Sequence, residues 1–307
     1  MSTQPVRPAG TRPASGPSVR LTPHHPAWPA GWREMNDPPE QVFAAGEAAA
    51  LSTPAIGVVG TRRATHRGLA VAHGLGAALA ALGWTVVSGL ARGIDAAAHR
   101  GALEVGGRSI GVMATGIDLT YPAAHRRLRS RLQERGCAVT EFEAGTGPRR
   151  FHFPRRNRLI AGLVRGLVVV EAPVRSGALL TAYLALDYDR EVFAVPGPVD
   201  LDSSRGCHHL LREGAHLLEG PEDLERILGR PETCDPAPGA VPSGPEPGSP
   251  AAWILDRLDL EGVPRDALRE RWPGNEEGWQ RGLLDLELSG LIRRLPGGRL
   301  ARTIWRP

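Results

Sequence analysis

The chain has 307 residues, a formal net charge of +4 and 41% hydrophobic residues, enough for one sizeable domain and a smaller one. It contains no lysine, so every basic side chain other than histidine is arginine. This composition excludes a P-loop nucleotidase, whose phosphate loop needs a lysine, and Schiff-base chemistry, which needs a lysine amine. The modest positive charge permits a nucleic-acid partner without requiring one.

The cysteines and the apolar stretches predict a cellular location. Cys137, Cys207 and Cys234 show no CxxC or Cys/His metal-ligand spacing, so we expect reduced thiols, no metal site and a cytoplasmic protein. The apolar stretch 69–87 is interrupted by His73 and by glycines. We therefore expect no signal peptide and no membrane-spanning helix.

Composition divides the chain into four parts. Residues 1–50 are rich in proline, glycine, arginine and serine, with Trp28 and Trp32 as the only bulky anchors, and predict a largely disordered N-terminal extension. Residues 51–230 form the main domain. Within it, short apolar strands are predicted at 56–60, 85–88, 109–113, 138–141, 167–171 and 191–195. Helices are predicted at 67–83, 95–103, 123–135, 159–164, 177–187 and 207–213. Continuous apolar strands alternating with helices indicate an α/β protein with an open, doubly wound parallel sheet.

The C-terminal part begins after a proline-rich linker at 231–250, which cannot continue helix or sheet. Residues 251–307 then show three helical patterns, followed by two short strands around a Pro-Gly-Gly turn. This order predicts a small winged-helix-like domain.

The run at 149–158 combines five arginines with two phenylalanines and one histidine. Arginines can follow phosphates and flat rings can stack on bases, and neither contact requires a particular base sequence. The alternative is a solvated basic loop with Phe151 and Phe153 folded back into the core. From these residues alone, the two interpretations are equally weighted.

Other loops at the carboxyl ends of the predicted strands are rich in glycine, serine, threonine and arginine. Gly60 precedes a helix and lets backbone amides approach an anion, and Ser176 can cap another helix as a second anion site. Arg92 stands on a flexible turn between two glycines. Asp95 is expected to cap the following helix, and His99 to make a local hydrogen bond. A further loop at this edge holds Thr115–Asp118 and Tyr121 with Pro122.

Two glutamates end strands at the same edge. Glu141 and Glu171 could suggest acid–base catalysis, but in such a cationic site we expect them to bind arginines and loop amides. We identify no nucleophile elbow, no metal-ligand cluster and no GxGxxG motif. The sequence therefore predicts binding without catalysis and without a cofactor.

Together these motifs resemble the DprA/Smf family of bacterial DNA-processing proteins. The resemblance runs from Ile56 to about Leu228 and resumes weakly in the C-terminal part. It rests on residues 59–62, 88–95, 98–99, 116–118, 121–122, 153–163, 168–172, 176–177, 181–182, 195–197, 210–211 and 214–215.

The resemblance implies an extended Rossmann-like fold that binds single-stranded DNA without sequence preference. It also implies loading of a RecA-type recombinase during natural transformation, displacement of single-strand-binding protein, and a homodimer. The predicted DNA-binding residues, with Ser176 added from its capping position, are Gly60, Arg62, Ser88, Arg92, Phe153, Arg155, Arg156, Asn157, Arg158 and Ser176.

Two other functions are compatible with parts of the sequence. A nucleotide phosphoribohydrolase-like Rossmann enzyme would resemble this chain around Ser176–Thr181, but the loop lacks the glutamate that such an enzyme needs. A transcription regulator could act through the winged-helix-like domain, but the cationic residues cluster in the main domain.

Overall fold

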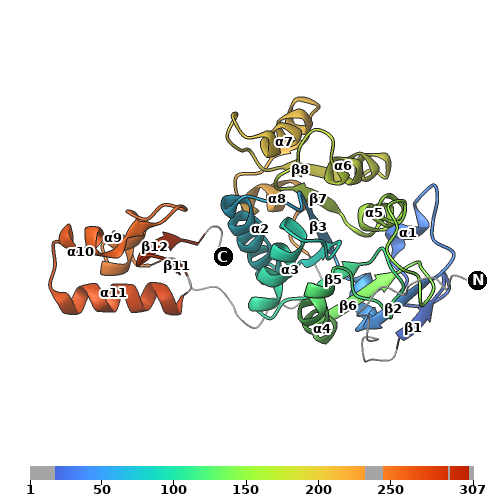
Figure 1. Ribbon diagram of the computed structural model, residues 1–307, viewed down its shortest axis with the longest axis horizontal. Helices are drawn as coiled ribbons and strands as arrows, with labels where there is room; N and C mark the ends of the chain where they lie inside the picture. Colours follow the sequence, from blue (N-terminus) through green and yellow to red (C-terminus); the bar gives the residue numbers. More distant parts are fainter. Residues whose placement is uncertain (1–17, 232–244, 290, 304–307) are drawn as a thin grey trace, which may run out of the picture.

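The computed structural model describes residues 18–231, 245–289 and 291–303. The strands of its main domain are β1 (Ser18–Leu21), β2 (Val42–Gly46), β3 (Ala55–Val59), β4 (Thr85–Ser88), β5 (Ser109–Val112), β6 (Gly136–Thr140), β7 (Gly166–Val169), β8 (Glu191–Ala194) and β9 (His216–Leu217). They form one nine-stranded sheet in the order β1-β2-β6-β5-β4-β3-β7-β8-β9 (Figure 1). The strands from β3 to β9 are parallel, and β1 and β2 add to one edge in antiparallel pairing.

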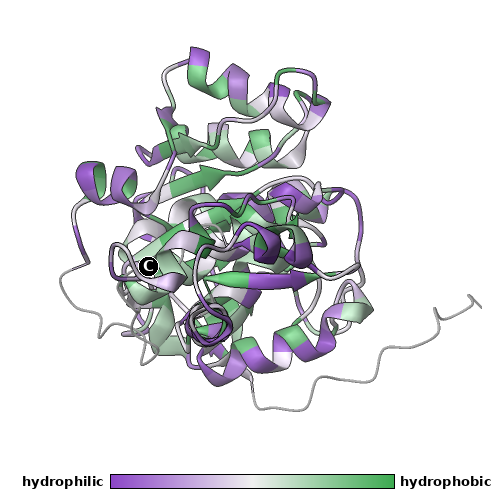
Figure 2. Ribbon diagram, turned by 90° about the vertical axis from the view of Figure 1, so that its left-hand side faces the viewer, coloured by the Kyte–Doolittle hydropathy of each residue, from purple (hydrophilic) through white to green (hydrophobic). Residues whose placement is uncertain are grey.

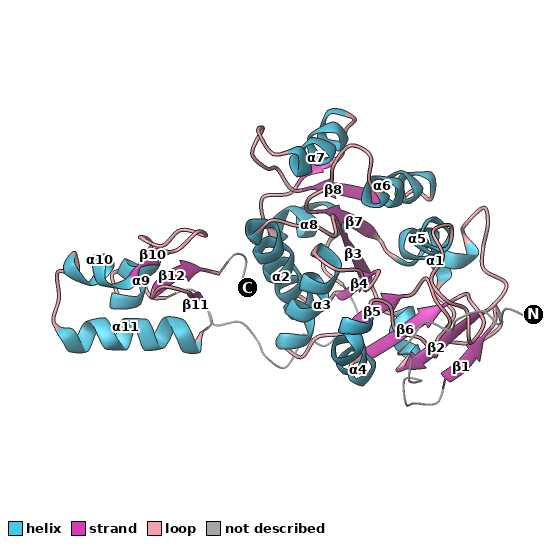
Figure 3. Cartoon of the chain, in the orientation of Figure 1, coloured by secondary structure: helices cyan, strands magenta, loops and turns pink. Residues whose placement is uncertain are grey.

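Helices cover both faces of this sheet (Figure 3). One face packs against α1 (Ala30–Arg33), α5 (His152–Leu163), α6 (Gly177–Asp187) and α7 (Asp202–Arg212). The other packs against α2 (His66–Ala81), α3 (Ile94–Glu104), α4 (Arg126–Glu134) and α8 (Pro221–Leu228). Two 3₁₀ turns, η1 (Ala48–Ser52) and η2 (Ala123–His125), join these elements. The doubly wound α/β fold predicted from the sequence is confirmed.

The central strands explain why the sequence folds this way. Every residue of β3 and β4 is buried, as expected for parallel strands covered by helices on both faces. Figure 2 shows hydrophobic residues on strands in the interior and hydrophilic residues on the outward surfaces of the helices. Removal of this apolar surface from water is the main driving force for the fold.

The strand order reverses between β3 and β7. From β3 the chain builds β4, β5 and β6 toward one edge, and from β7 it builds β8 and β9 toward the other. Open α/β sheets bind ligands in the crevice outside the carboxyl ends of the strands at such a reversal. The carboxyl ends of β3 and β7 therefore mark where a binding site is expected.

The N-terminal extension differs from its prediction. Residues 1–17 lie outside the described part, but 18–50 are not disordered: they form β1, α1 and β2 and extend the sheet beyond β6. Trp28 and Trp32 are buried and pack edge to face with ring centroids 5.3 Å apart. The Trp32 indole donates a hydrogen bond to the Leu159 carbonyl at 3.0 Å, which fastens this segment to α5.

The C-terminal unit has its own hydrophobic core around Trp279, Ile254 and Leu286. Its elements are α9 (Pro250–Leu255), β10 (Val263–Pro264), α10 (Arg265–Glu270), α11 (Glu276–Leu288), β11 (Ile292–Leu295) and β12 (Arg299–Arg302). The expected helices and hairpin are present, and the winged-helix assignment stays a prediction. Most of the predicted linker, residues 232–244, lies outside the described residues.

Two of the cysteines can be placed. Cys137 and Cys207 are buried free thiols, and burial raises the pKa of each to about 12. Cys234 lies outside the described residues. Within the described part of the chain, no helix combines the length and the apolar character needed to cross a bilayer.

Candidate nucleic-acid interface

A groove of about 370 Å³ lies at the reversal between β3 and β7. Its walls come from the loop after β3, the first turns of α5, and the loop that joins β7 to α6. The lining residues are Val59, Gly60, Thr61, Arg62, Arg63, Ala91, Asp95, Phe153, Pro154, Arg156, Asn157, Ile160, Pro173, Ser176, Gly177, Ala178, Leu180 and Thr181.

Gly60 allows the two loops of the groove to approach each other. A Cβ atom at this position would lie 2.5 Å from the Ile94 Cγ1 atom and 2.8 Å from the Glu171 carbonyl oxygen. The next amide, that of Thr61, donates to the same Glu171 carbonyl at 2.7 Å. A larger side chain at residue 60 would force this connection apart, so its glycine has a structural reason.

The basic run at 149–158 is divided by helix geometry. The sequence analysis placed a helix at 159–164, but α5 begins at His152 and includes most of the run. Pro154 lies in the first turn, where its missing amide hydrogen costs no hydrogen bond. With 3.6 residues per turn, one side of α5 presents Phe153, Arg156, Asn157 and Ile160 to the groove.

Arg155 and Arg158 instead meet Glu141, at the end of β6. The Arg155 Nε atom lies 3.0 Å from a Glu141 carboxylate oxygen, and Arg158 pairs with the other oxygen. Arg158 also donates to the Asp37 carbonyl at 2.6 Å, which binds the N-terminal segment to α5. The arginine-binding role expected for Glu141 is confirmed, while Arg155 keeps a largely exposed side chain.

Arg156 is buried beneath the groove, with only 5% of its surface exposed. Its guanidinium donates to the carbonyl oxygens of Gly89 and Val112 and, at 3.0 Å, to the Asn157 side-chain oxygen. Burial lowers its pKa to about 10, and the nearby Asp95 opposes that shift. The guanidinium therefore holds the ends of β4 and β5 together and has little freedom to bind a phosphate.

Asn157 and Asp95 complete this internal support. The Asn157 amide donates to the Gly177 carbonyl at 3.1 Å and connects α5 to the start of α6. The expectation that Asp95 caps the helix is wrong: α3 begins at Ile94 with Gly93 as its N-cap, and one Asp95 carboxylate oxygen instead accepts hydrogen bonds from the loop amides of Gly89 and Ala91, at 3.1 and 3.3 Å. Burial raises the Asp95 pKa, and the charge of Arg156 opposes the shift. Asp95 thus shapes the loop 89–93, on which Arg92 stands exposed.

The two predicted serines occupy different environments. Ser88 is fully buried at the end of β4 and donates to the Val58 carbonyl at 2.6 Å. Ser176 lines the groove and caps α6, where its hydroxyl accepts from the Leu179 amide at 3.3 Å. Ser88 can therefore support the groove only from below, while Ser176 and the first amides of α6 face it.

The groove rim carries a cluster of one cation and two aromatic rings. The Arg62 guanidinium carbon lies 4.6 Å from the centroid of the Phe153 ring. On the same ring, Tyr121 packs at 6.0 Å with an interplanar angle of 59°, and Tyr121 is 49% exposed. The alternative interpretation required Phe151 and Phe153 to fold back into the core. Phe151 is instead exposed and Phe153 is half-buried.

Three residues around this rim were not predicted from the sequence to bind DNA. Tyr121 had been placed at the correct sheet edge without a binding role, and Arg63 and Arg175 had none. Both arginines are exposed in the loops that precede α2 and α6. Both arginines could have been predicted from the sequence, because each lies in a loop that follows a strand next to the reversal of strand order.

Local roles expected for two other polar residues are confirmed. Glu171 accepts hydrogen bonds from the amide and the hydroxyl of Thr65, at 3.0 and 2.5 Å, at the start of α2. His99 is buried and bonds the Ser109 hydroxyl at 2.7 Å, and burial lowers its pKa to about 3. Among the described residues, no cluster of histidine, cysteine and acidic side chains could hold a metal ion.

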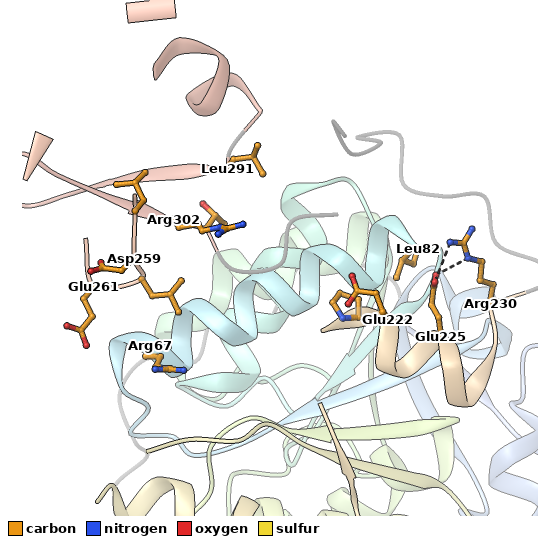
Figure 4. A pocket seen from close by; sticks show the side chains of 13 residues that line it. Arg67, Leu82, Glu222, Glu225, Arg230, Asp259, Glu261, Leu291 and Arg302 are labelled. Atoms are coloured by element: carbon orange, nitrogen blue, oxygen red, sulfur yellow. Dashed lines mark hydrogen bonds and ion pairs between the residues drawn. The ribbon is translucent and has the colours of Figure 1, made fainter. Parts of the chain in front are cut away.

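A larger cleft of about 870 Å³ lies between α2, α8 and the C-terminal unit (Figure 4). Its charged lining residues are Arg67, Glu222, Glu225, Arg230, Asp259, Glu261 and Arg302. Arg230 is already paired with Glu225 at 2.9 Å. Carboxylates repel a polyanion, so the smaller groove with its exposed arginines is the better nucleic-acid site.

Comparison with known proteins gives a consistent result. A family model described as DNA recombination-mediator protein A matches residues 20–228. The chain is 41% identical to Protein Smf of Escherichia coli over 269 residues, which are 85% of this chain and 71% of that protein.

Two solved structures share the fold. DNA processing protein A from Streptococcus pneumoniae superposes with a TM-score of 0.66 at 39% identity, over 69% of this chain and 74% of that one. The second is DNA processing protein A from Helicobacter pylori, whose structure addresses a single-stranded DNA binding mode. It superposes with a TM-score of 0.64 at 26% identity, over 71% of this chain and 98% of that one. The predicted Rossmann-like fold and the resemblance to the DprA/Smf family are confirmed.

Proposed function

Because the chain belongs to the DNA recombination-mediator protein A family, we propose that it binds single-stranded DNA without sequence preference and loads a RecA-type recombinase onto it. The observation that carries this proposal is the cluster of Arg62, Phe153 and Tyr121 on the rim of the groove. Rings for bases beside cations for phosphates are the contacts that single strands accept whatever their sequence.

The charges around the groove support a polyanionic ligand. Arg62, Arg63, Arg92 and Arg175 are exposed on the loops at this edge, and the start of α6 adds backbone amides. Asp95 is the one carboxylate among the described lining residues, and backbone amides already engage it. These features favour holding a strand over catalysis on it.

The partners belong to the same proposal. We place the protein in the cytoplasm as a homodimer that displaces single-strand-binding protein and delivers the strand to the recombinase during natural transformation and recombination. Family membership supports this sequence of events. A strand-exchange assay with the recombinase and single-strand-binding protein tests it: the protein should relieve inhibition by single-strand-binding protein, and no relief would contradict loading.

DNA binding is tested by titrating oligothymidine, a mixed-sequence single strand and a duplex over a series of salt concentrations. We expect similar affinities for both single strands and weaker binding to duplex. The logarithm of affinity should fall with the logarithm of salt concentration, with a slope of about −0.7 for each phosphate neutralised. A flat salt response, or a preference for duplex, would contradict the proposal.

A further inference from the structure

Phe151 stands outside the groove and, at 62%, is the most exposed phenylalanine, tyrosine or tryptophan in the described part of the chain. It is the N-cap residue of α5 and follows Arg149 and Arg150, which are also exposed. Single exposed apolar side chains are common on protein surfaces, but this ring lies beside two cations. A ring next to arginines favours a ligand that is both flat and anionic.

Buried aromatic residues hold this ring in place. Phe151 packs edge to face against His152, with centroids 4.6 Å apart and an angle of 83°. His152 in turn stacks on Phe142 at 4.2 Å, and both are buried. The guanidinium carbon of Arg149 lies 6.0 Å from the Phe151 centroid. A ring fixed in this way loses little conformational freedom when a ligand stacks on it.

Helix geometry separates Phe151 from the cluster of Arg62, Phe153 and Tyr121 on the groove rim. Residues two positions apart along a helix do not face each other, so Phe151 and Phe153 point to different sides of the start of α5. Phe153 contacts Arg62 and Tyr121, whereas Phe151 contacts Arg149 and His152. The two rings therefore offer separate surfaces, at opposite sides of one helix terminus.

We propose that Phe151, flanked by Arg149, is a second base-stacking platform, and that the bound strand crosses the start of α5 from the groove to this ring. This inference rests on the proposed single-stranded DNA binding and assigns it a second contact site. The strand contacts Phe153 in the groove and Phe151 beyond it, so the full site is longer than the groove.

The test measures fluorescence anisotropy of labelled oligothymidines of increasing length with the full chain and three variants. Phe151→Ala removes the ring, Phe151→Trp keeps a flat ring, and Leu284→Ala removes an exposed apolar side chain on α11 of the C-terminal unit. We expect Phe151→Ala to bind long oligomers about 5- to 150-fold more weakly, the range that loss of one base stack produces. Oligomers that fill only the groove should bind unchanged, so the affinity of Phe151→Ala stops rising at a shorter length than that of the wild type.

Phe151→Trp and Leu284→Ala should both match the wild type. The salt slope of Phe151→Ala should also stay unchanged, because a stacking ring neutralises no phosphate. If Phe151→Ala binds oligomers of every length as tightly as the wild type, the proposal that Phe151 stacks on a base is overturned. This is the result expected if the ring contacts a protein partner instead. Equal weakening at all lengths would also overturn it, because the ring would then act on the groove itself. If the wild type fails to bind oligothymidine, the proposed function falls together with this inference.

Discussion

Arg156→Ala is expected to lower the free energy of unfolding by about 3–5 kcal/mol, because each buried acceptor left without its donor costs about 1–3 kcal/mol. The side chain is 5% exposed and bonds two carbonyl oxygens and the Asn157 side chain. Its removal leaves these acceptors unsatisfied and leaves the buried Asp95 without its cationic neighbour. For a domain of this size, the loss corresponds to a melting temperature lower by about 6–20 °C.

Arg155→Ala is the matched control, because it removes the adjacent arginine, whose side chain is 57% exposed, and leaves Glu141 paired with Arg158. Ion pairs made by an exposed arginine contribute less than about 1 kcal/mol, and Glu141 keeps its second partner, so this variant should melt within a few degrees of the wild type. Thermal and urea denaturation of both variants, followed by circular dichroism, measures the difference. If Arg156→Ala is as stable as Arg155→Ala and loses only affinity for single strands, Arg156 is a phosphate ligand and the supporting role assigned to it is refuted.

Three further changes test other parts of the site. Arg92→Ala should leave stability unchanged, because the side chain is exposed. The slope of log affinity against log salt concentration should become shallower by about 0.7. An unchanged slope in binding titrations would show that Arg92 does not contact a phosphate. Phe153→Leu keeps an apolar side chain but loses the flat ring, so single-strand binding should weaken by about 1–3 kcal/mol with little change in melting temperature; full affinity would show that no base stacks there. His99 has its pKa lowered from 6.5 to about 3, so its neutral form stabilises the fold fully above about pH 6.5, and this contribution is lost as the pH falls toward 3. His99→Gln should therefore lose less stability on acidification than the wild type, by up to about 1.4 kcal/mol per pH unit within that window. Urea denaturation at several pH values measures this difference. The same pH dependence in both proteins would show that another group is responsible.

Periodicity made the doubly wound sheet predictable, because its central strands are short, continuous and apolar. The strands β1 and β2 were missed because they lie in a segment rich in proline and glycine. Their stability comes from tertiary contacts that a local pattern does not contain, among them the packing of Trp28 and Trp32 and the bond from Trp32 to Leu159.

The site was predictable as a location more than as a set of contacts. The glycine-rich and arginine-rich loops predicted the edge of the sheet at which the groove lies, and the local roles of Glu141, Glu171 and His99 followed from their surroundings. The burial of Arg156 could not be predicted in this way. It depends on carbonyl oxygens of Gly89 and Val112 that only the folded sheet brings together. Recognising Pro154 as a first-turn residue would have shown that α5 starts early and that its arginines face different sides.

The most direct test of the central claim is a crystal structure of the protein with oligothymidine. The account predicts a strand that enters the groove between the carboxyl ends of β3 and β7, with a base stacked on Phe153 and phosphates beside Arg62 and Arg92. A strand bound at the C-terminal unit, with the groove empty, would contradict it.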